Sequence, residues 1–300
     1  MIYRSFEQLL DQSESGSPAR TAVVMAQEIE TLQAVVKAWK DGIALPVLIG
    51  KKGTIQQNLR QLMIDENAFE ICDCSSTEEC LEETARLLRS GAVDVVMKDQ
   101  IKTGDLMKMF VKKENGFLKG TLLSHVAFNE LPIYHKLLCI TDTSLNVAPD
   151  LKGKAELIRN AVFVMKNMGF DEPKVAVMAA VEYENPKMKE TVDAAMLKKM
   201  NRENQLENCI VEGPISLDLA IDSHAAQIKN FHSPVAGDAD LLVVPDLVSG
   251  NLLGKAMNYM PQSRFAGFVT GACVPIVLTS RASSTENKYW SLALACAAVC

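Results

Sequence analysis

The chain has 300 residues, of which 48% are apolar, so it is long enough for one large or two medium globular domains with a substantial core. Its 31 Lys and Arg residues against 37 Asp and Glu residues give a net charge of -6, which excludes the basic field that non-specific binding to nucleic acid or an anionic membrane requires. Because Glu7 and Asp11 interrupt any N-terminal apolar stretch and no apolar run spans a bilayer, we expect a cytoplasmic protein without a signal peptide.

Short apolar runs rich in Val, Ile and Leu alternate along the chain with longer stretches of helical periodicity. This is the pattern of strands buried on both faces between helices, so the sequence predicts an α/β fold. In chain order the expected strands are 21–25, 45–49, 93–97, 136–140, 174–181, 240–245 and 275–279, each bounded by Gly, Pro, Asp or Ser.

Four helices are expected from apolar residues three and four positions apart. The first covers 28–40 and ends before Gly42, and the second covers 155–168 and ends at Gly169. A third begins at Asn185 with Pro186 at its first position, and the last covers 289–300. We interpret their apolar faces as core-facing surfaces.

Several common chemistries have no support in the sequence. No two glycines have the G-x-G spacing of a dinucleotide fold, and the P-loop-like run 250–255 is one residue short. The four histidines are scattered, no cysteines form a CxxC pair, and no G-x-S-x-G elbow is present. We therefore expect neither ATP hydrolysis, nor a zinc site, nor a serine hydrolase.

Segment 274–287 combines a buried strand, a turn rich in hydroxyl groups and the start of the last expected helix. N–H groups at a helix start and nearby hydroxyls bind phosphate, and Arg281 can hold two phosphate oxygens. The run from Ser283 to Glu286 also fits a capping box, in which Glu286 closes the helix and contributes about 1 kcal/mol. The segment is therefore either an anion site or a helix cap.

Three other expected strands lead into polar segments, and open α/β sheets bind ligands beyond the carboxyl ends of their strands. Segment 239–251 leads to an expected Asn N-cap, Asn251, and segment 137–149 carries Asp142 and Asn146, which could instead make Asx turns. Segment 96–104 contains two lysines and a threonine that could bind a ligand; alternatively, the two lysines are only solvated.

Taken together, these segments resemble the phosphate acetyl/butyryl transferase family, and its butyryltransferase branch more closely than its acetyltransferase branch. The resemblance rests on segments in the family's order along the chain: 97–98 with Thr103, 142–149, 179–182 with 185–188, 212–218, 235–240, 245–251 with Lys255, and 279–281. It implies two α/β/α lobes like those of isocitrate and isopropylmalate dehydrogenases, with the site in a central cleft. The expected lobes are 1–124 with 268–300, and 125–267.

The resemblance also implies the reaction. The family exchanges an acyl group between coenzyme A and inorganic phosphate, so acyl-CoA and phosphate are the expected partners, with a butyryl or similar short acyl group and no metal or nucleotide cofactor. Both substrates would be bound together, with Ser280 holding the CoA thiol and Arg281 the phosphate and the charge of the transition state. A homo-oligomer is expected.

Two positions depart from the family pattern. Asn287 lies where the acetyltransferase branch has an aspartate base, which leaves Glu286 as the available carboxylate, and Asp99 replaces the usual glycine, where it would repel phosphate unless it points away. The alternatives are a metal- and NAD-dependent dehydrogenase of the same superfamily, or a CoA- or anion-binding protein without turnover. The expected substrate-binding residues are Lys98, Thr103, Asp142, Ser144, Asn146, Glu182, Asp246, Asn251, Lys255 and Asn287.

Overall fold

The computed structural model describes residues 3–12, 17–280 and 283–299, and the chain divides into two compact units. The first unit comprises Ser13–Thr121 and Ala266–Cys300. The second unit comprises Met1–Gln12 and Leu122–Phe265. The C-terminal segment therefore returns to the unit that contains most of the N-terminal third of the chain.

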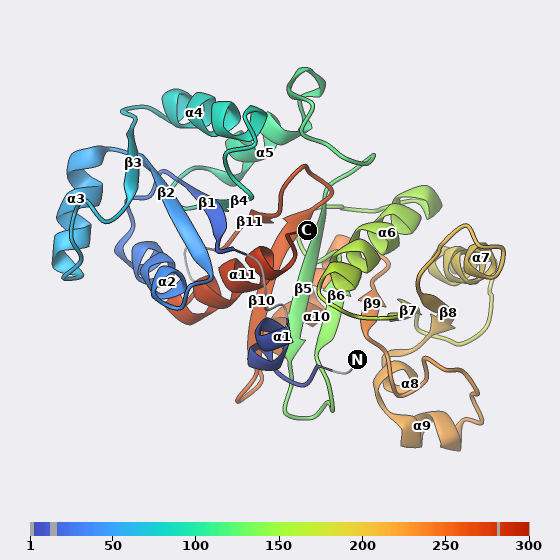
Figure 1. Ribbon diagram of the computed structural model, residues 1–300. Helices are drawn as coiled ribbons and strands as arrows, with labels where there is room; N and C mark the ends of the chain where they lie inside the picture. The colour runs from blue at the N-terminus through green and yellow to red at the C-terminus, as the bar shows by residue number, and fades with distance from the viewer. Residues whose placement is uncertain (1–2, 13–16, 281–282, 300) are drawn as a thin grey trace. The chain divides into compact units, whose positions relative to one another are not determined.

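In the first unit, parallel strands are followed by helices that cover both faces of a sheet. The strand order is β3-β2-β1-β4-β11-β10, and only β10 is antiparallel to its neighbour β11. Helices α2 and α11 pack on one face, and α4 and α5 lie on the other (Figure 1). The bounds are β1 Ala19–Val24, α2 Ile29–Lys40, β2 Ala44–Gly50, α3 Lys52–Gln61, β3 Glu70–Asp73, α4 Thr77–Arg89, β4 Val95–Lys98, α5 Thr103–Val111, the 3-10 turn Lys113–Asn115, β10 Arg264–Thr270, β11 Ile276–Val277 and α11 Thr285–Ala297.

The second unit has the strand order β5-β6-β9-β7-β8, with β5 antiparallel to β6 and the remaining pairs parallel. One core cluster packs α8, α9 and α10 against one face of these strands. Helices α6 and α7 contact each other, α6 also contacts β5, β6 and β9, and α7 also contacts β7 and β8. The bounds are α1 Phe6–Gln12, β5 Ser124–Glu130, β6 Leu138–Thr141, α6 Leu151–Asn167, β7 Lys174–Met178, α7 Lys189–Arg202, β8 Ile210–Ile215, α8 Leu217–Ile221, α9 Ser223–Ile228, β9 Leu241–Val243 and α10 Leu247–Asn258.

The predicted α/β class is confirmed, because each expected strand coincides with an observed one. The sequence did not predict β3, β5, β8 and β10, which carry polar residues, Gly or Pro. In β5, for example, Ser124, His125 and Asn129 are buried although they are polar. Apolar continuity therefore identifies strands with uninterrupted Val, Ile and Leu runs and misses strands interrupted by polar residues, Gly or Pro.

Three expected helix starts are wrong. Helix α6 begins at Leu151 and not at residue 155, because the Asp150 side chain caps it by accepting the Gly153 N–H (2.8 Å). Helix α7 begins at Lys189 and not at Asn185, because the Asn185 carbonyl accepts the Met188 N–H (2.8 Å) in a turn that precedes the helix. Helix α11 begins at Thr285 and not at residue 289, because Ser284 caps it.

The N-terminal helix belongs to the second unit, whereas the expected lobe boundary placed it with the first. Phe6 and Leu9 are fully buried, and the Leu137 N–H donates to the Tyr3 carbonyl (2.7 Å). The Tyr3 carbonyl thus attaches the residues just before α1 to a part of the chain more than a hundred residues away.

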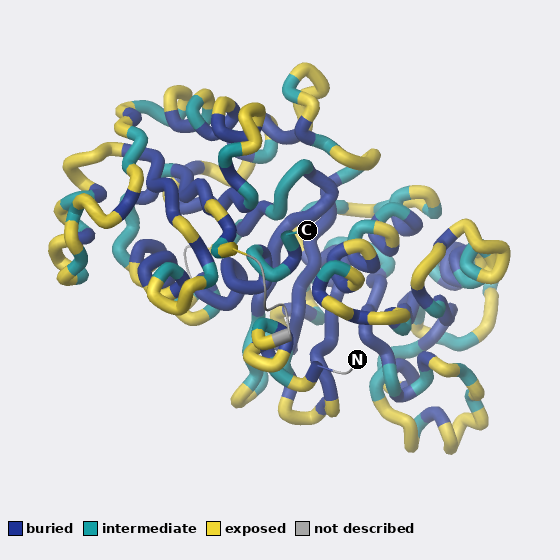
Figure 2. Tube along the Cα trace, in the orientation of Figure 1, coloured by how far each residue is buried: buried dark blue, intermediate teal, exposed yellow. Residues whose placement is uncertain are grey.

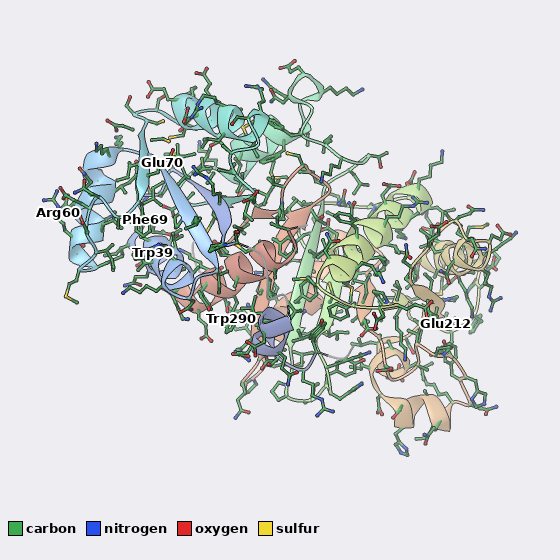
Figure 3. The ribbon with its side chains drawn as sticks, in the orientation of Figure 1. Trp39, Arg60, Phe69, Glu70, Glu212 and Trp290 are labelled. Atoms are coloured by element: carbon green, nitrogen blue, oxygen red, sulfur yellow. The ribbon has the colours of Figure 1, made fainter. Side chains whose placement is uncertain are left out.

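The core of each unit follows the strands. Figure 2 shows the central strands as buried and the outer turns of the helices as exposed. At the edge of the first unit, Trp39 of α2 and Phe69, which precedes β3, pack edge to face with ring centroids 5.0 Å apart (Figure 3). Within the described residues, no helix has the length and apolar character needed to cross a membrane.

Candidate functional site

The candidate residues of the first unit lie at the carboxyl ends of neighbouring strands, on the same edge of its sheet. Strands β4 and β11 are parallel neighbours, with Met97 opposite Val277. Strand β4 ends at Lys98 and is followed by Thr103, and the segment after β11 carries Ser280, Glu286 and Asn287. Parallel register thus places both segments beyond adjacent carboxyl ends, where ligands bind in open α/β sheets. Arg281 lies outside the described residues.

The lysine at the end of β4 is buried. Lys98 is 6% exposed, and its Nζ donates to the backbone carbonyl of Asp99 (2.9 Å). The alternative of solvated lysines is therefore wrong for Lys98, whereas Lys102 is exposed. Thr103 is exposed at the first position of α5.

The start of α11 is capped differently from the expected capping box. Ser284, and not Ser283, is the N-cap, and its Oγ accepts the Asn287 N–H (3.1 Å). Glu286 is consequently the second residue of the helix, with an exposed side chain whose Oε1 lies 3.4 Å from Nε1 of Trp290. The idea that Glu286 closes a capping box is wrong, and its carboxylate remains accessible to solvent.

The candidate residues of the second unit also follow adjacent parallel strands. Strand β9 lies between β6 and β7, and Val243 pairs with both Thr141 and Val177. The segments after these three strands carry the candidates Asp142, Ser144, Asn146, Asp246, Asn251, Lys255 and Glu182.

Asp142 holds the loop that follows β6. It is 2% exposed, and its Oδ1 accepts the N–H groups of Ser144 (2.8 Å) and Leu145 (3.0 Å). Its Oδ2 accepts the His125 N–H (3.1 Å) and Nδ2 of Asn146 (2.6 Å). This is the Asx turn that the sequence offered as the alternative. Of the three candidates in this loop, only Ser144 is exposed.

The histidine behind this loop is buried. Nδ1 of His125 lies 2.8 Å from Oγ1 of Thr143, and burial lowers the pKa of His125. A neutral imidazole therefore stabilises the loop from within the core.

At the start of α10, Asp246 is the N-cap. Its Oδ1 accepts the Ser249 N–H (2.8 Å), a bond that holds its pKa below the ordinary value. The expected N-cap, Asn251, lies inside the helix instead, and its Nδ2 reaches the Thr143 carbonyl (3.3 Å). Helix α10 is thereby joined to the loop after β6, while Lys255 is exposed one turn further on.

The carboxylate that follows β7 is paired. Oε1 of Glu182 accepts from Oγ of Ser216 (2.6 Å) and from Nζ of Lys229 (3.0 Å). These two hydrogen bonds lower the pKa of Glu182. Glu182 is therefore an anion over the whole neutral range, already engaged with a hydroxyl and an ammonium group.

A buried polar network next to Lys98 was not predicted from the sequence. Asp99 is 5% exposed, and its Oδ2 accepts the N–H groups of Gln27 and Glu28 (both 2.8 Å) just before α2. The carboxylate therefore points into the protein. Burial raises the pKa of Asp99 to about 6. Its partners further along the network are Thr31, Glu28 and Lys288. The sequence signal that could have revealed it was Lys288, which directly precedes the mostly apolar run 289–295.

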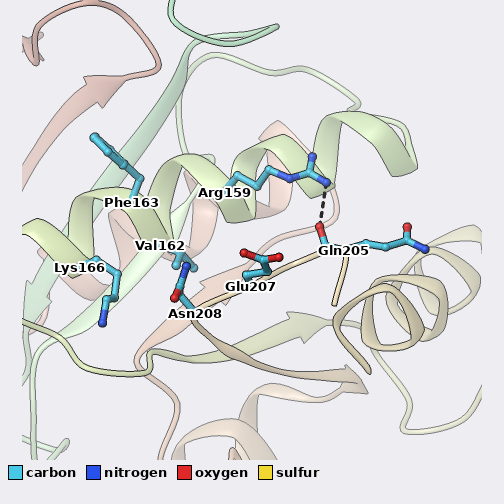
Figure 4. A pocket seen from close by; sticks show the side chains of 7 residues that line it. All are labelled: Arg159, Val162, Phe163, Lys166, Gln205, Glu207 and Asn208. Carbon is cyan, nitrogen blue, oxygen red and sulfur yellow. Dashed lines mark hydrogen bonds between the residues drawn. The ribbon is translucent and has the colours of Figure 1, made fainter. Parts of the chain in front are cut away.

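Three pockets in the described part of the chain lie away from the candidate residues. The pocket in Figure 4, of about 390 Å³, lies between α6 and the segment before β8, where Nη2 of Arg159 donates to the Gln205 carbonyl (3.1 Å). A pocket of about 580 Å³ is lined by His135 and Asp238, and one of about 440 Å³ lies between α4 and α5. None of the three is lined by a candidate residue named above.

Comparison with known proteins gives consistent matches over almost the whole chain. The family model described as phosphate acetyl/butaryl transferase matches residues 82–296. The chain is 37% identical to a phosphate acetyltransferase of Thermotoga maritima over 96% of this chain and 98% of that protein. It is equally 37% identical to a phosphate butyryltransferase of Clostridium acetobutylicum, over 98% of each chain. A crystal structure of a branched-chain phosphotransacylase from Enterococcus faecalis V583 superposes with a TM-score of 0.82 at 33% identity, covering 93% of this chain and 98% of that one.

Proposed function

Because the chain belongs to the phosphate acetyl/butyryl transferase family, we propose that it exchanges a butyryl group between coenzyme A and inorganic phosphate by direct transfer. The membership itself makes it a phosphate acyltransferase, and the observation that carries this conclusion is the match over nearly the full length of relatives with that activity in their names. The equal identity to an acetyl and a butyryl enzyme does not distinguish the acyl groups. The preference for butyryl is supported by Glu182 after the Ala179-Ala180-Val181 run, which resembles the butyryltransferase branch.

In the proposed mechanism both substrates are bound together and the protein supplies position and charge. The hydroxyl of Ser280 hydrogen-bonds the CoA thiol, and the Arg281 guanidinium holds phosphate and offsets the negative charge of the tetrahedral transition state. In the direction of thioester synthesis, Glu286 takes the thiol proton, since thiolate is the better nucleophile. Its exposure and its position outside the cap support this role.

The other proposed contacts divide into two groups. Lys98, Thr103 and Asn287 belong to the first unit, and Ser144, Glu182, Asp246, Asn251 and Lys255 belong to the second. For Asp142 and Asn146 the hydrogen bonds above support a role in shaping the loop that presents Ser144. The two-lobed arrangement around a cleft, the absence of a metal or nucleotide cofactor, the homo-oligomer and the cytoplasmic location stay predictions.

The decisive experiment measures thiol release from acetyl-, propionyl-, butyryl- and isobutyryl-CoA with and without phosphate. We expect release that depends on phosphate and is fastest with butyryl-CoA. Direct transfer predicts intersecting initial-velocity lines when both substrates are varied, whereas a covalent acyl-enzyme would give parallel lines. Binding of CoA without phosphate-dependent release would leave a binding protein without turnover and would refute the proposed enzyme.

The same assay tests the assigned guanidinium. Arg281→Ala should lower kcat by at least about 10²-fold, because loss of one donor to the transition-state charge typically costs this much. Arg60→Ala is the matched control: this exposed arginine of α3 pairs only with Glu66 among the contacts described (Nε to Oε2, 2.7 Å), so its loss should leave turnover unchanged. Near-normal turnover in Arg281→Ala would show that the active site does not lie in the segment that contains Arg281.

A further inference from the structure

The network around Asp99 joins three segments of the first unit. Asp99 follows β4, Glu28 and Thr31 lie at the start of α2, and Lys288 belongs to the first turns of α11. Nζ of Lys288 donates to Oε2 of Glu28 (2.6 Å) and to Oγ1 of Thr31 (3.0 Å). Oγ1 of Thr31 lies 2.7 Å from Oδ1 of Asp99 and 3.1 Å from Oε2 of Glu28.

The direction of these hydrogen bonds is fixed by the single proton of the Thr31 hydroxyl. While Asp99 is ionised, this proton goes to the nearer carboxylate, Asp99, and the Thr31 oxygen accepts from Lys288. A donor chain then runs from Lys288 through Thr31 to Asp99. Because Lys288 is 2% exposed, its ammonium needs these partners and cannot turn to water instead.

Protonation of Asp99 requires a different arrangement. A proton on its Oδ1 would meet the Thr31 proton, so the hydroxyl must rotate toward Glu28. The Thr31 hydroxyl therefore has two orientations, one donating to Asp99 and one donating to Glu28, and the protonation state of Asp99 determines which is adopted. The charged groups that face this site are Glu28 and Lys288, with Nζ of Lys98 held by the Asp99 carbonyl.

We propose that Asp99 is a positioning residue of the phosphate acyltransfer site: through Thr31, Glu28 and Lys288, its ionised carboxylate holds the end of β4 against the start of α11. The end of β4 carries Lys98, and the start of α11 carries Glu286 and Asn287. Neither Asp99 nor Thr31 touches substrate in this arrangement. The inference rests on the proposed function, because it concerns the placement of residues to which that function assigns roles.

The raised pKa gives the positioning role a measurable pH dependence. As the pH falls through about 6, Asp99 takes up a proton and the donor chain is broken. Asp99→Asn is a model of this state, because the amide oxygen can still accept the Gln27 and Glu28 N–H groups while the amide nitrogen donates to Thr31.

The test compares kcat and KM for phosphate in wild type and Asp99→Asn from about pH 5 to about pH 8. We expect wild type to exceed the variant in kcat/KM by about 10-fold near pH 8, the size of effect that small displacements of site residues produce. The ratio should approach one below pH 6. Using the ratio removes the titration of phosphate and of other groups, which is common to both proteins.

Thr31 provides a matched pair of variants. Thr31→Ser keeps the hydroxyl and should retain the wild-type dependence of kcat/KM on pH. The isosteric Thr31→Val should lower kcat/KM, and adding Asp99→Asn to Thr31→Val should cause no further loss. A role in stability alone would not change the ratio with pH. If wild type is active and the ratio stays constant from about pH 5 to about pH 8, the inference is overturned. If wild type releases no thiol with phosphate, it is the proposed function that fails.

Discussion

At the scale of a single residue, Asp99 makes the stability of the protein depend on pH in an unusual direction. Most carboxylates in folded proteins have lowered pKa values and stabilise the fold as the pH rises. The pKa of Asp99 is instead raised to about 6 because burial disfavours the charged form. The contribution of Asp99 to the free energy of unfolding is therefore complete below its unfolded pKa of about 4. This contribution is lost as the pH rises through about 6.

We therefore expect wild type to lose stability relative to Asp99→Asn between about pH 4 and about pH 7, by at most about 3 kcal/mol. Urea unfolding of both proteins across this range measures the difference. Asp105→Asn, at a half-exposed position of α5, is the control for the exchange of a carboxyl group for an amide. Parallel stability curves for wild type and Asp99→Asn would show that the Asp99 carboxyl has an ordinary pKa.

At the scale of an element, two glycines of α10 differ in what surrounds them. A Cβ on Gly250 would lie 2.4 Å from the carbonyl oxygen of Asp142, so this close approach of helix and loop requires a glycine. A Cβ on Gly254, one turn later, would meet Cγ2 of Thr143 at 3.4 Å, an ordinary contact. The helix thus approaches the loop after β6 most closely where Asp142 anchors it.

Gly250→Ala should destabilise the protein by about 1 to 3 kcal/mol through this overlap and displace the loop that carries Ser144. Gly254→Ala should be neutral or stabilising by about 1 kcal/mol, because alanine favours the helix. Thermal unfolding of the two variants tests the contrast. Equal effects at both positions would mean that the loop moves away without cost.

At the scale of the whole molecule, one arginine adds ion pairs to the contacts that attach the N-terminal helix to its unit. Arg264 binds both carboxylate oxygens of Glu7 (2.5 and 2.8 Å) and the carboxylate of Glu130 (2.5 Å). These bonds with Arg264 lower the pKa of Glu7 to about 2. The stabilisation is therefore present above the ordinary pKa of Glu and is lost only as the pH falls toward 2.

Arg264→Gln should lower the melting temperature by about 2 to 4 °C, the shift expected for loss of about 1 kcal/mol in a chain of this size. The difference from wild type should persist at about pH 4, where Glu7 is still ionised. Arg4→Gln, an exposed arginine just before α1, is the control. A difference that has vanished by about pH 4 would contradict the assigned pairing.

The sequence by itself determined the α/β class and the strands with uninterrupted apolar runs, because parallel strands buried on both faces leave such runs. It also indicated the family, because the segments after several strands keep their residues and their order. The sequence did not assign the roles of polar residues. Asp142 and Asp246 are residue types that also bind ligands, yet in the structure both carboxylates accept backbone N–H groups. Only the tertiary structure decided between these uses, since the hydrogen-bond partners of a short polar side chain depend on which loops the sheet brings together.

Tertiary contacts also decided where Asp99 points and what Lys288 binds. Their partners Thr31 and Glu28, at the start of α2, lie tens to hundreds of residues away in the sequence, so no local sequence pattern could predict these contacts. Local periodicity reflects burial along one element, whereas a buried charge is satisfied by groups from several elements. The sequence therefore specified which layers form, and the packing of those layers specified which charged groups meet.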